Sequence, residues 1–380
     1  MDGFYPGRGQ TQAKHAILQR YLEVFAFKVG TTFGSFDFID GFSGPWQERD
    51  KEAFSDTSFG IALRQLQLAA EKLLEKGHRV SIRCIFNEKD TESYNRLTNY
   101  LEKAATGYPL VEVHALHGEF AENVDLINTL AKSQFRFLFI DPTGWTGFPP
   151  AAIERILSGY RSEIIVNFMQ EHITRFLTSP TDAQENGLIE LLGPQRAKDM
   201  IGKYHTINEI EEAYRRMMRE DFLFRFVASS PIYMENSDKL HFRLMYGSNH
   251  PAGVDLLREV EVKSLNEHDD RKARLKENPL QPSLFETSED FKSGPYREAR
   301  REHLRNLKQD IAFRLSSQNK DLTFQRLQAE IQCDRFVRST EIKGAIASLA
   351  VDGLVEPTWK LRGQHKKKPD KLDKIFLIER

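Results

Sequence analysis

The sequence predicts an α/β protein with a doubly wound, mostly parallel sheet, followed by a smaller C-terminal module. Short apolar segments alternate with amphipathic helical patterns between residues 11 and 169, which is typical of βαβ units. Two of these segments, 137–140 and 164–166, are apolar without interruption, as expected of central strands buried on both faces. Near the end of the chain, three helical patterns precede two strand-like ones.

The predicted elements alternate in a regular order. Residues 11–28 place apolar side chains on one face of a helix, and the first strand follows at 37–40. A helix over 57–76 ends at Gly77, a residue suited to a helix C-cap. Further helices are expected at 91–105, up to about 132 and at 151–157, with strands at 80–86, 111–116, 135–140 and 163–169.

Two more segments extend this domain to residue 263. Residues 171–226 show helical patterns with interruptions, and we interpret them as a helical insertion on the same domain. Residues 232–234 and 240–246 have strand character, and the polar segment 235–238 between them predicts a hairpin.

The C-terminal part is predicted to be a separate module. From residue 264 to residue 295 the periodicity is lost, and charged residues, prolines and serines predict a linker. Residues 296–380 then follow the plan of a winged helix-turn-helix domain. Its helices are expected at 297–316, 323–332 and 339–352, and its two strands at 355–361 and 374–378.

The net charge of −1 conceals an uneven distribution. Residues 296–380 contain 19 Lys and Arg against 12 Asp and Glu, a charge of +7, so residues 1–295 carry −8. A basic module on an acidic body is typical of proteins that bind nucleic acid. A solvated charged segment is the alternative on charge alone.

Composition restricts the class of protein. An apolar fraction of 40% and a charged fraction of 29% fit an ordinary globular chain. Without a long apolar run or a signal-peptide pattern, we expect neither a membrane span nor secretion. Cys84 and Cys333 fall in different predicted domains, so we expect no disulfide and a cytoplasmic location. His114 and His117 lack carboxylates at matching spacing, and we expect no metal site.

Acidic residues recur where the predicted strands end. Asp40 ends the first strand, Glu88 follows the second, Glu119 the third, and Asp141 the fourth. The carboxyl ends of parallel strands share one edge of the sheet, where ligands bind in such folds. Each acid alone could equally be a helix N-cap or a solvated loop residue. Four of them in register favour a binding site.

The residue types around these acids indicate the ligand. Glu88 is placed to accept hydrogen bonds from ribose hydroxyls, and Glu119 with Phe120 to flank an adenine. Asp40 suits a cationic, methionine-like group. The small residues of the turn after the first strand allow close approach of the backbone; they are Gly41, Ser43 and Gly44. Neither a G-x-G-x-x-G turn nor a P-loop is present, which favours S-adenosylmethionine over NAD or ATP.

The segment 141–145 is the candidate catalytic loop. Asp141 would orient an acceptor amine while Trp145 stacks on its ring, a combination used to read flipped-out bases. Pro142 shapes the loop between them. The alternative is a simple turn at a strand end, with Trp145 as buried filler.

The C-terminal module carries candidate nucleic-acid contacts. Three cations surround the start of the third helix, where a recognition helix would enter a groove, and three occupy the loop between the predicted strands. They are Arg335, Arg338, Lys343, Lys366, Lys367 and Lys368. Winged-helix modules also bind proteins, which is the alternative for this surface.

Three motifs resemble those of the three-Cys-motif partner protein (TcmP) family. They are the segments 14–22 (KHAILQRYL), 38–45 (FIDGFSGP) and 139–144 (FIDPTG). The similarity extends over the whole chain and implies a class I S-adenosylmethionine-dependent methyltransferase fold with a winged-helix domain attached. It also implies a bacterial protein with a co-encoded three-Cys-motif partner. In motif layout the family is similar to enzymes that methylate adenine in large-subunit ribosomal RNA.

Two positions depart from these patterns. Trp46 stands where the family usually has glycine. Thr143 and Gly144 stand where amino-methylating enzymes carry a second proline and an aromatic residue, which weakens the case for amine methylation.

The sequence therefore predicts transfer of a methyl group from S-adenosylmethionine to a nucleic-acid base. A catalytically degenerate protein, which senses a cofactor or holds a partner or nucleic acid, is the main alternative, and residues 143–144 favour it. An NAD-dependent oxidoreductase is disfavoured by the missing glycine fingerprint.

Overall fold

A computed structural model describes residues 9–44, 54–144, 146–169, 182–200, 206–276, 292–317, 322–362 and 366–378. The chain forms two compact units. Unit 1 comprises residues 1–227 and 231–249, and unit 2 comprises residues 228–230 and 250–380.

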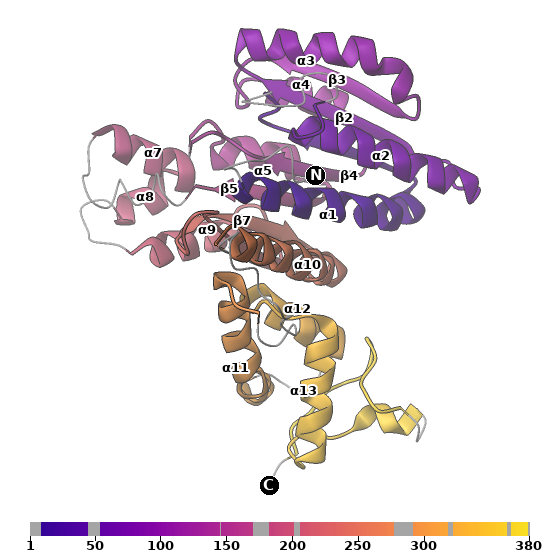
Figure 1. Ribbon diagram of the computed structural model, residues 1–380, viewed down its shortest axis with the longest axis vertical. Helices are drawn as coiled ribbons and strands as arrows, with labels where there is room; N and C mark the ends of the chain where they lie inside the picture. The colour runs from indigo at the N-terminus through magenta and orange to yellow at the C-terminus, as the bar shows by residue number, and fades with distance from the viewer. Residues whose placement is uncertain are drawn as a thin grey trace. The chain divides into compact units, whose positions relative to one another are not determined.

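A seven-stranded sheet has the order β3-β2-β1-β4-β5-β7-β6 (Figure 1). The first five strands in sequence are parallel to their neighbours, whereas β7 runs antiparallel to β5. The predicted doubly wound α/β sheet is therefore confirmed. The strands are β1 (Ser35–Asp40), β2 (Ser81–Glu88), β3 (Val111–His117), β4 (Phe135–Ile140), β5 (Arg161–Phe168), β6 (Phe226–Tyr233) and β7 (Leu240–Ser248).

Helices alternate with the parallel strands, as predicted. In unit 1 they are α1 (Gly9–Phe33), α2 (Ser58–Glu75), α3 (Thr91–Ala104), the 3-10 turn η1 (Ala105–Gly107), α4 (Val124–Leu130) and α5 (Pro150–Leu157). The segment predicted as a helical insertion contains α7 (Asp182–Leu192), α8 (Pro194–Met200) and α9 (Ile207–Glu220).

The alternation of side chains along the strands divides the core between two faces. On one face, Phe36 and Phe137 pack edge-on against Phe25 of α1, with ring centroids 5.2 and 5.0 Å apart. On the other face, Ile39 and Leu138 belong to a cluster that includes buried residues of the helices α4, α5, α7 and α9. The sheet is thus covered on both sides, which explains its continuous apolar strands.

The predicted hairpin is present and longer than expected. Strands β6 and β7 are adjacent, and the Met234 N–H donates to the Lys239 carbonyl oxygen across the turn, over 2.9 Å.

The described residues of unit 2 form the α-helices α10 (Pro251–Lys276), α11 (Pro295–Ser317), α12 (Phe324–Asp334) and α13 (Ser339–Val351). The predicted linker is wrong at its start, since residues 264–276 belong to α10. Most of the buried positions there are polar, so the hydrophobic pattern is weak. They are Ser264, His268, Asp269 and Lys272, beside the apolar Leu265. Residues 277–291 lie outside the described part.

The helices α11, α12 and α13 share an apolar core with the segment that follows them. The strand predicted over 355–361 is wrong, because residues Thr358–Arg362 form the 3-10 turn η3. Pro357 lacks an N–H for a ladder, and the adjacent Trp359 is buried in the core, 1% exposed. In the described part, one isolated bridge, Val355 with Leu377, joins the two predicted strands, and Lys374 instead bridges to Thr323 before α12. The winged-helix assignment stays a prediction.

The described residues contain no helix that is long and apolar enough to cross a membrane. They also contain no group of three or more His, Cys, Asp or Glu placed to hold a metal ion. Cys84 and Cys333 are both buried as free thiols.

Candidate functional site

A cleft of about 310 Å³ lies in unit 1 where the strands β1, β4 and β5 end. This is the edge at which doubly wound sheets bind ligands. The helices α1 and α2 and strand β7 also contribute to its wall. The lining residues are Thr11, Lys14, His15, Phe42, Gly44, Asp56, Thr57, Ser58, Asp141, Pro142, Thr143, Asn167, Met169, His241 and Phe242.

Asp141, directly after β4, is held on both carboxylate oxygens. Its Oδ2 accepts a hydrogen bond within an ion pair from the Lys14 ammonium. Its Oδ1 accepts from the Asn167 amide Nδ2 over 2.8 Å. The predicted catalytic carboxylate therefore lies in the cleft with a fixed orientation, and Pro142 lies beside it.

Lys14 reaches the cleft from the buried face of α1. It lies four residues before Leu18 and seven before Tyr21, so it shares the helix face that packs on the sheet. The residue is only 8% exposed, and its ammonium lies 5.8 Å from the centre of the Phe242 ring. The apolar stripe of α1 thus places a cation at the end of β4.

Asp40 lies at the end of β1 but is fully buried, 0% exposed. Its Oδ2 accepts from the Ser58 hydroxyl over 2.6 Å, and its Oδ1 accepts from the Phe42 N–H over 3.0 Å. Burial raises the pKa of Asp40 to about 7, against the lowering effect of these hydrogen bonds. Asp40 is not among the lining residues, but it accepts a hydrogen bond from Ser58, which lines the cleft.

A tight turn brings the first residues of α2 to the cleft. The Thr57 hydroxyl caps the helix by accepting from the Gly60 N–H, and Phe54 has a φ of +46°. A Cβ on Gly60 would lie 2.1 Å from the Phe54 carbonyl oxygen, so only glycine fits. The turn presents Asp56, Thr57 and Ser58 to the cleft.

Glu88 ends β2 and is 3% exposed, and its Oε1 accepts from the Asp90 N–H over 2.7 Å. Burial raises the pKa of Glu88. Beside it, Asn87 Nδ2 donates to the carbonyl oxygens of Gly41 and Gly118, over 3.3 and 3.1 Å, and joins the ends of three strands.

Two predicted adenine contacts lie apart from the cleft lining. Glu119 is exposed and pairs with Lys89, with 3.4 Å between the charged atoms. Phe120 is 1% exposed, belongs to the apolar core, and lies 5.9 Å from Phe42 between ring centroids. Their roles in cofactor binding stay predictions.

The glycine turn after β1 is packed against protein. A Cβ on Gly41 would lie 2.9 Å from Ile140 and 3.0 Å from Phe120, so the glycine serves close packing of the turn. Ser43 is fully buried, and its hydroxyl donates to the Asp40 carbonyl oxygen over 3.1 Å. Gly44 reaches the cleft. Trp46 and Trp145 lie outside the described residues, so the predicted stacking role of Trp145 stays a prediction.

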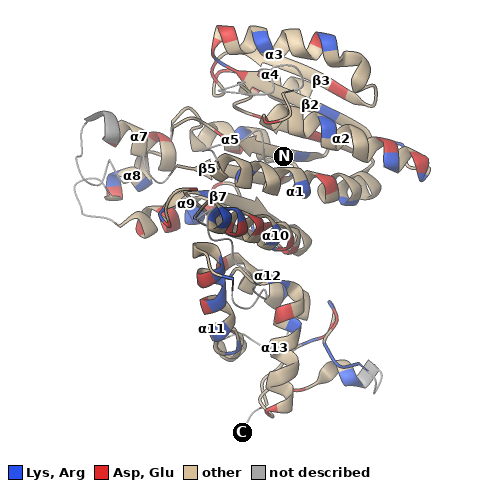
Figure 2. Ribbon diagram, viewed as in Figure 1, with Lys and Arg blue, Asp and Glu red and all other residues tan. Residues whose placement is uncertain are grey.

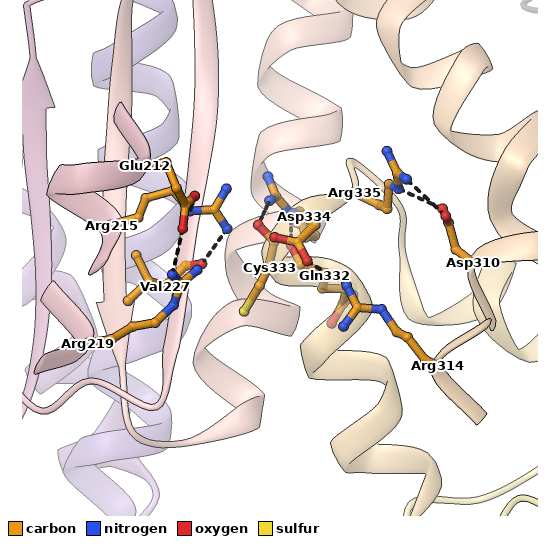
Figure 3. A network of polar contacts seen from close by, with 11 residues as sticks. Glu212, Arg215, Arg219, Val227, Asp310, Arg314, Gln332, Cys333, Asp334 and Arg335 are labelled. Carbon is orange, nitrogen blue, oxygen red and sulfur yellow. Dashed lines mark hydrogen bonds and ion pairs between the residues drawn. The ribbon is translucent and has the colours of Figure 1, made fainter. Parts of the chain in front are cut away.

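Two of the predicted nucleic-acid contacts in unit 2 are engaged by acids. Arg335 forms hydrogen bonds of 2.6 and 2.9 Å with Asp310, as Figure 3 shows. Arg338 pairs with Glu341 at the start of α13, over 3.0 Å. These pairings reduce the charge that each arginine can offer to a phosphate.

The predicted lysines differ among themselves. Lys343 lies 5.3 Å from the centre of the Phe324 ring. Lys366 pairs with Asp370, whereas Lys367 and Lys368 are exposed and have no partner in the described part of the chain.

Lys14 and Asn167, the two partners of Asp141, are among the cleft residues that sequence reasoning did not assign. For Lys14 a signal was present, since a lysine at helical spacing with Leu18 and Tyr21 lies on a buried face. Asn167 sits in a strand whose burial on both faces makes a polar residue unusual.

The strand order places β7, antiparallel to β5, between β5 and β6 in an otherwise doubly wound α/β sheet. It differs from the dinucleotide-binding order 3-2-1-4-5-6 by that inserted strand. No protein-family model and no curated protein matches the chain.

Solved structures with low similarity include three methyltransferases. An O-methyltransferase from Bacillus cereus in complex with SAH shares 12% identity over 60% of this chain and 80% of its own, with a TM-score of 0.31. A loganic acid methyltransferase with SAH shares 10% sequence identity, and the match covers 71% of this chain and 86% of that protein, with a TM-score of 0.32. The O-methyltransferase TomG from Streptomyces achromogenes in complex with SAM shares 10% sequence identity. The match covers 64% of this chain and 91% of that protein, with a TM-score of 0.31.

Proposed function

We propose that this protein is an S-adenosylmethionine-dependent methyltransferase that acts on a base of a nucleic acid. The observation that carries the proposal is the cleft at the carboxyl ends of β1, β4 and β5, with Asp141 fixed between Lys14 and Asn167. A fold by itself does not define an activity, so the residues of this site carry the proposal.

The residues present fit the cofactor. Glu88 is a buried carboxylate at the end of β2, the position that suits ribose hydroxyls, but it is not among the residues that line the cleft. The N-terminal turn of α2 lies on the cleft and favours a carboxylate, while Asp56 beside it suits an ammonium group. The cleft volume of about 310 Å³ is at the lower end of the range for small-molecule sites. S-adenosylmethionine supplies a methyl group on a sulfonium, which is electrophilic without further activation.

The chain's own contribution is orientation. Methyl transfer is accelerated when the acceptor atom is held in line with the methyl group. Asp141 is suited to this because its carboxylate cannot rotate freely while Lys14 and Asn167 hold it. The rings of Phe42 and Phe242 line the same cleft and offer apolar surface to a planar acceptor.

Nucleic acid as the substrate is supported by unit 2. Its segment after α13 carries exposed lysines without acidic partners in the described residues, among them Lys367 and Lys368. Figure 2 shows both basic and acidic residues along α11, where Arg297, Arg300, Lys308 and Arg314 form ion pairs with acids. The proposed winged helix would recruit the polymer through the exposed lysines after α13.

A catalytically degenerate sensor is the second candidate. It is favoured by the pairing of Asp141 with Lys14, because the carboxylate expected to receive a substrate amine already has a partner. Both candidates bind the cofactor, but a sensor transfers nothing.

Calorimetry tests the cofactor assignment. We expect wild-type protein to bind S-adenosylmethionine, and Glu88→Ala to bind it about tenfold or more weakly, because the ribose hydroxyls lose a charged acceptor. Glu102→Ala, which removes an exposed carboxylate on α3 with no predicted role in the site, serves as the control. Absence of binding, or equal binding by Glu88→Ala, would show the cofactor assignment to be wrong.

The resemblance in sequence also proposes a three-Cys-motif protein as partner. Copurification of the two co-expressed chains tests this, and separate elution at micromolar concentration would contradict it.

A further inference from the structure

The ion pair in the cleft leaves hydrogen-bonding capacity on both partners. A lysine ammonium has three N–H donors. Within the described residues, Lys14 donates to Asp141 and to no other protein acceptor, although it is only 8% exposed. A carboxylate oxygen accepts two hydrogen bonds, and each oxygen of Asp141 is bonded to one donor, Lys14 or Asn167.

A buried donor without an acceptor is costly, so the spare N–H groups of Lys14 indicate a ligand with an acceptor atom. The cation and the carboxylate are in direct contact and line one cleft. They therefore present a donor and an acceptor side by side. Their complement is a planar group with an acceptor atom and an N–H on neighbouring positions.

We propose that Lys14 and Asp141 together read the N–C–NH₂ edge of adenine or cytosine, with the exocyclic amine as the methyl acceptor. Lys14 donates to the ring nitrogen, and Asp141 accepts from the amine. The inference rests on the proposed function and names its substrate class. It assigns Lys14 to the specificity of the site, a role that its sequence position did not suggest.

The chemistry distinguishes this edge from other edges with a similar pattern. The neutral amine nitrogen attacks with its lone pair, the new N–C bond replaces the C–S bond, and the electron pair of that bond stays on sulfur. One proton then leaves the methylated nitrogen for water. A guanine N1–H or uracil N3–H has to lose its proton before attack, and a sugar hydroxyl matches only half of the donor–acceptor pair. Guanine has an N–C–NH₂ arrangement at N3 and its 2-amino group, but that edge lies beside the sugar.

Short DNA and RNA oligonucleotides that differ at a single base test the proposal. Their binding to the full chain is compared in the absence of a methyl donor. The probes carry adenosine, 1-deazaadenosine, which lacks the ring acceptor, or inosine, which lacks the amine. A matching set carries cytidine or 3-deazacytidine. Binding is measured by anisotropy at a salt concentration that suppresses backbone binding.

We expect wild-type protein to lose about tenfold or more in affinity when the ring nitrogen of its base is replaced by C–H, because a charge-assisted hydrogen bond is lost. In Lys14→Met the same replacement should change affinity by less than about twofold, since the donor is already absent. Lys14→Arg should restore the discrimination in part. Lys28→Met, on an exposed part of α1, is the matched control.

The possible results distinguish failure of this inference from failure of the proposed function. Discrimination that persists in Lys14→Met, or inosine bound as well as adenosine and cytidine, would overturn the proposal. If every variant binds S-adenosylmethionine but no oligonucleotide discriminates between bases, the edge assignment is wrong and the cofactor assignment stands. If wild-type protein does not bind the cofactor, the proposed function itself is wrong.

Discussion

Glu163 is a carboxyl group buried in the centre of unit 1. It lies on β5, 6% exposed, and accepts hydrogen bonds from the hydroxyls of Tyr21 over 2.6 Å and Ser248 over 3.1 Å. Burial raises its pKa from 4.5 to about 7, against the lowering effect of these hydrogen bonds. The folded state therefore favours the protonated form.

This shift predicts a pH-dependent stability. Because the folded pKa lies above the unfolded one, the contribution is complete below about pH 4.5 and is lost as the pH rises through about 7. Glu163→Gln stays neutral throughout. Between about pH 5 and about pH 8, wild-type protein should lose roughly 2 to 3 kcal/mol of unfolding free energy relative to this variant.

Urea unfolding of both proteins at the two pH values measures the difference. Other buried carboxyls, Asp40 among them, titrate in both proteins and cancel in the comparison. If the difference in unfolding free energy between the two proteins is the same at both pH values, the folded-state charge of Glu163 does not change between them, which would contradict the prediction.

Individual site residues were predictable to different degrees. Asp141 and Glu88 follow from strand ends, because a run of apolar residues that stops at an acid fixes its place on the sheet edge. That Asp141 would be paired was not predictable, since Lys14 lies 127 residues away in sequence. The burial of Asp40 likewise depends on Ser58, which belongs to another element.

At the scale of the element, two helices contain a glycine in opposite surroundings. In α2, a Cβ on Gly60 would meet the Phe54 backbone at 2.1 Å, whereas nothing lies within 4 Å of one on Gly344 in α13. Gly60→Ala should therefore destabilise the protein by about 1 to 3 kcal/mol through overpacking. Gly344→Ala should stabilise it by about 0.5 to 1 kcal/mol, because alanine loses less backbone entropy.

Chemical denaturation of the two variants checks this pair. Gly60→Ala should also weaken cofactor binding, because the turn before it carries Asp56 and Ser58 into the cleft. Equal stability of Gly60→Ala and wild-type protein would contradict the tight packing of that turn.

Elements with a regular apolar pattern were predicted closely, and β4 has the same bounds in the prediction and the structure. The misses have local physical causes. The second half of α10 has its helical spacing in buried polar residues such as Ser264 and His268. The segment 355–361 has strand-like composition, but Pro357 and the burial of Trp359 produce a 3-10 turn.

On the scale of the whole molecule, residues 1–295 are acidic and residues 296–380 are basic, which suggests different functions for the two parts of the chain. Unit 1 holds the candidate site, and the C-terminal part carries the excess of cations. Helix α13 has one lysine and one glutamate and is otherwise neutral. Recruitment of nucleic acid by the segment after α13 would therefore read phosphates rather than sequence.

Exchange of two exposed lysines for glutamine tests this recruitment. Lys367→Gln with Lys368→Gln should reduce nucleic-acid affinity about tenfold near 0.15 M salt. The slope of log affinity against log salt should fall by roughly 1.5 to 2, because two phosphate contacts are lost. The pair Lys72→Gln and Lys103→Gln, exposed in unit 1, provides the control. An unchanged slope would remove this segment from the interface.

The architecture of unit 1 was accessible from sequence because parallel sheets have a strong local signature of buried strands and amphipathic helices. The helices of unit 2 were accessible for the same reason. The arrangement around Asp141 was not, because it depends on how Lys14, Asp141 and Asn167 meet from three elements. Such a meeting is a property of the folded chain.

The most direct test of the central claim is transfer of a labelled methyl group from S-adenosylmethionine to mixed DNA and RNA by the full chain. The products are digested to nucleosides and identified by mass. We predict label on a base, at the exocyclic amine of adenine or cytosine, and strongly reduced transfer by Asp141→Ala. Bound cofactor without any transfer, or label found on sugar, would contradict the assignment as a base methyltransferase.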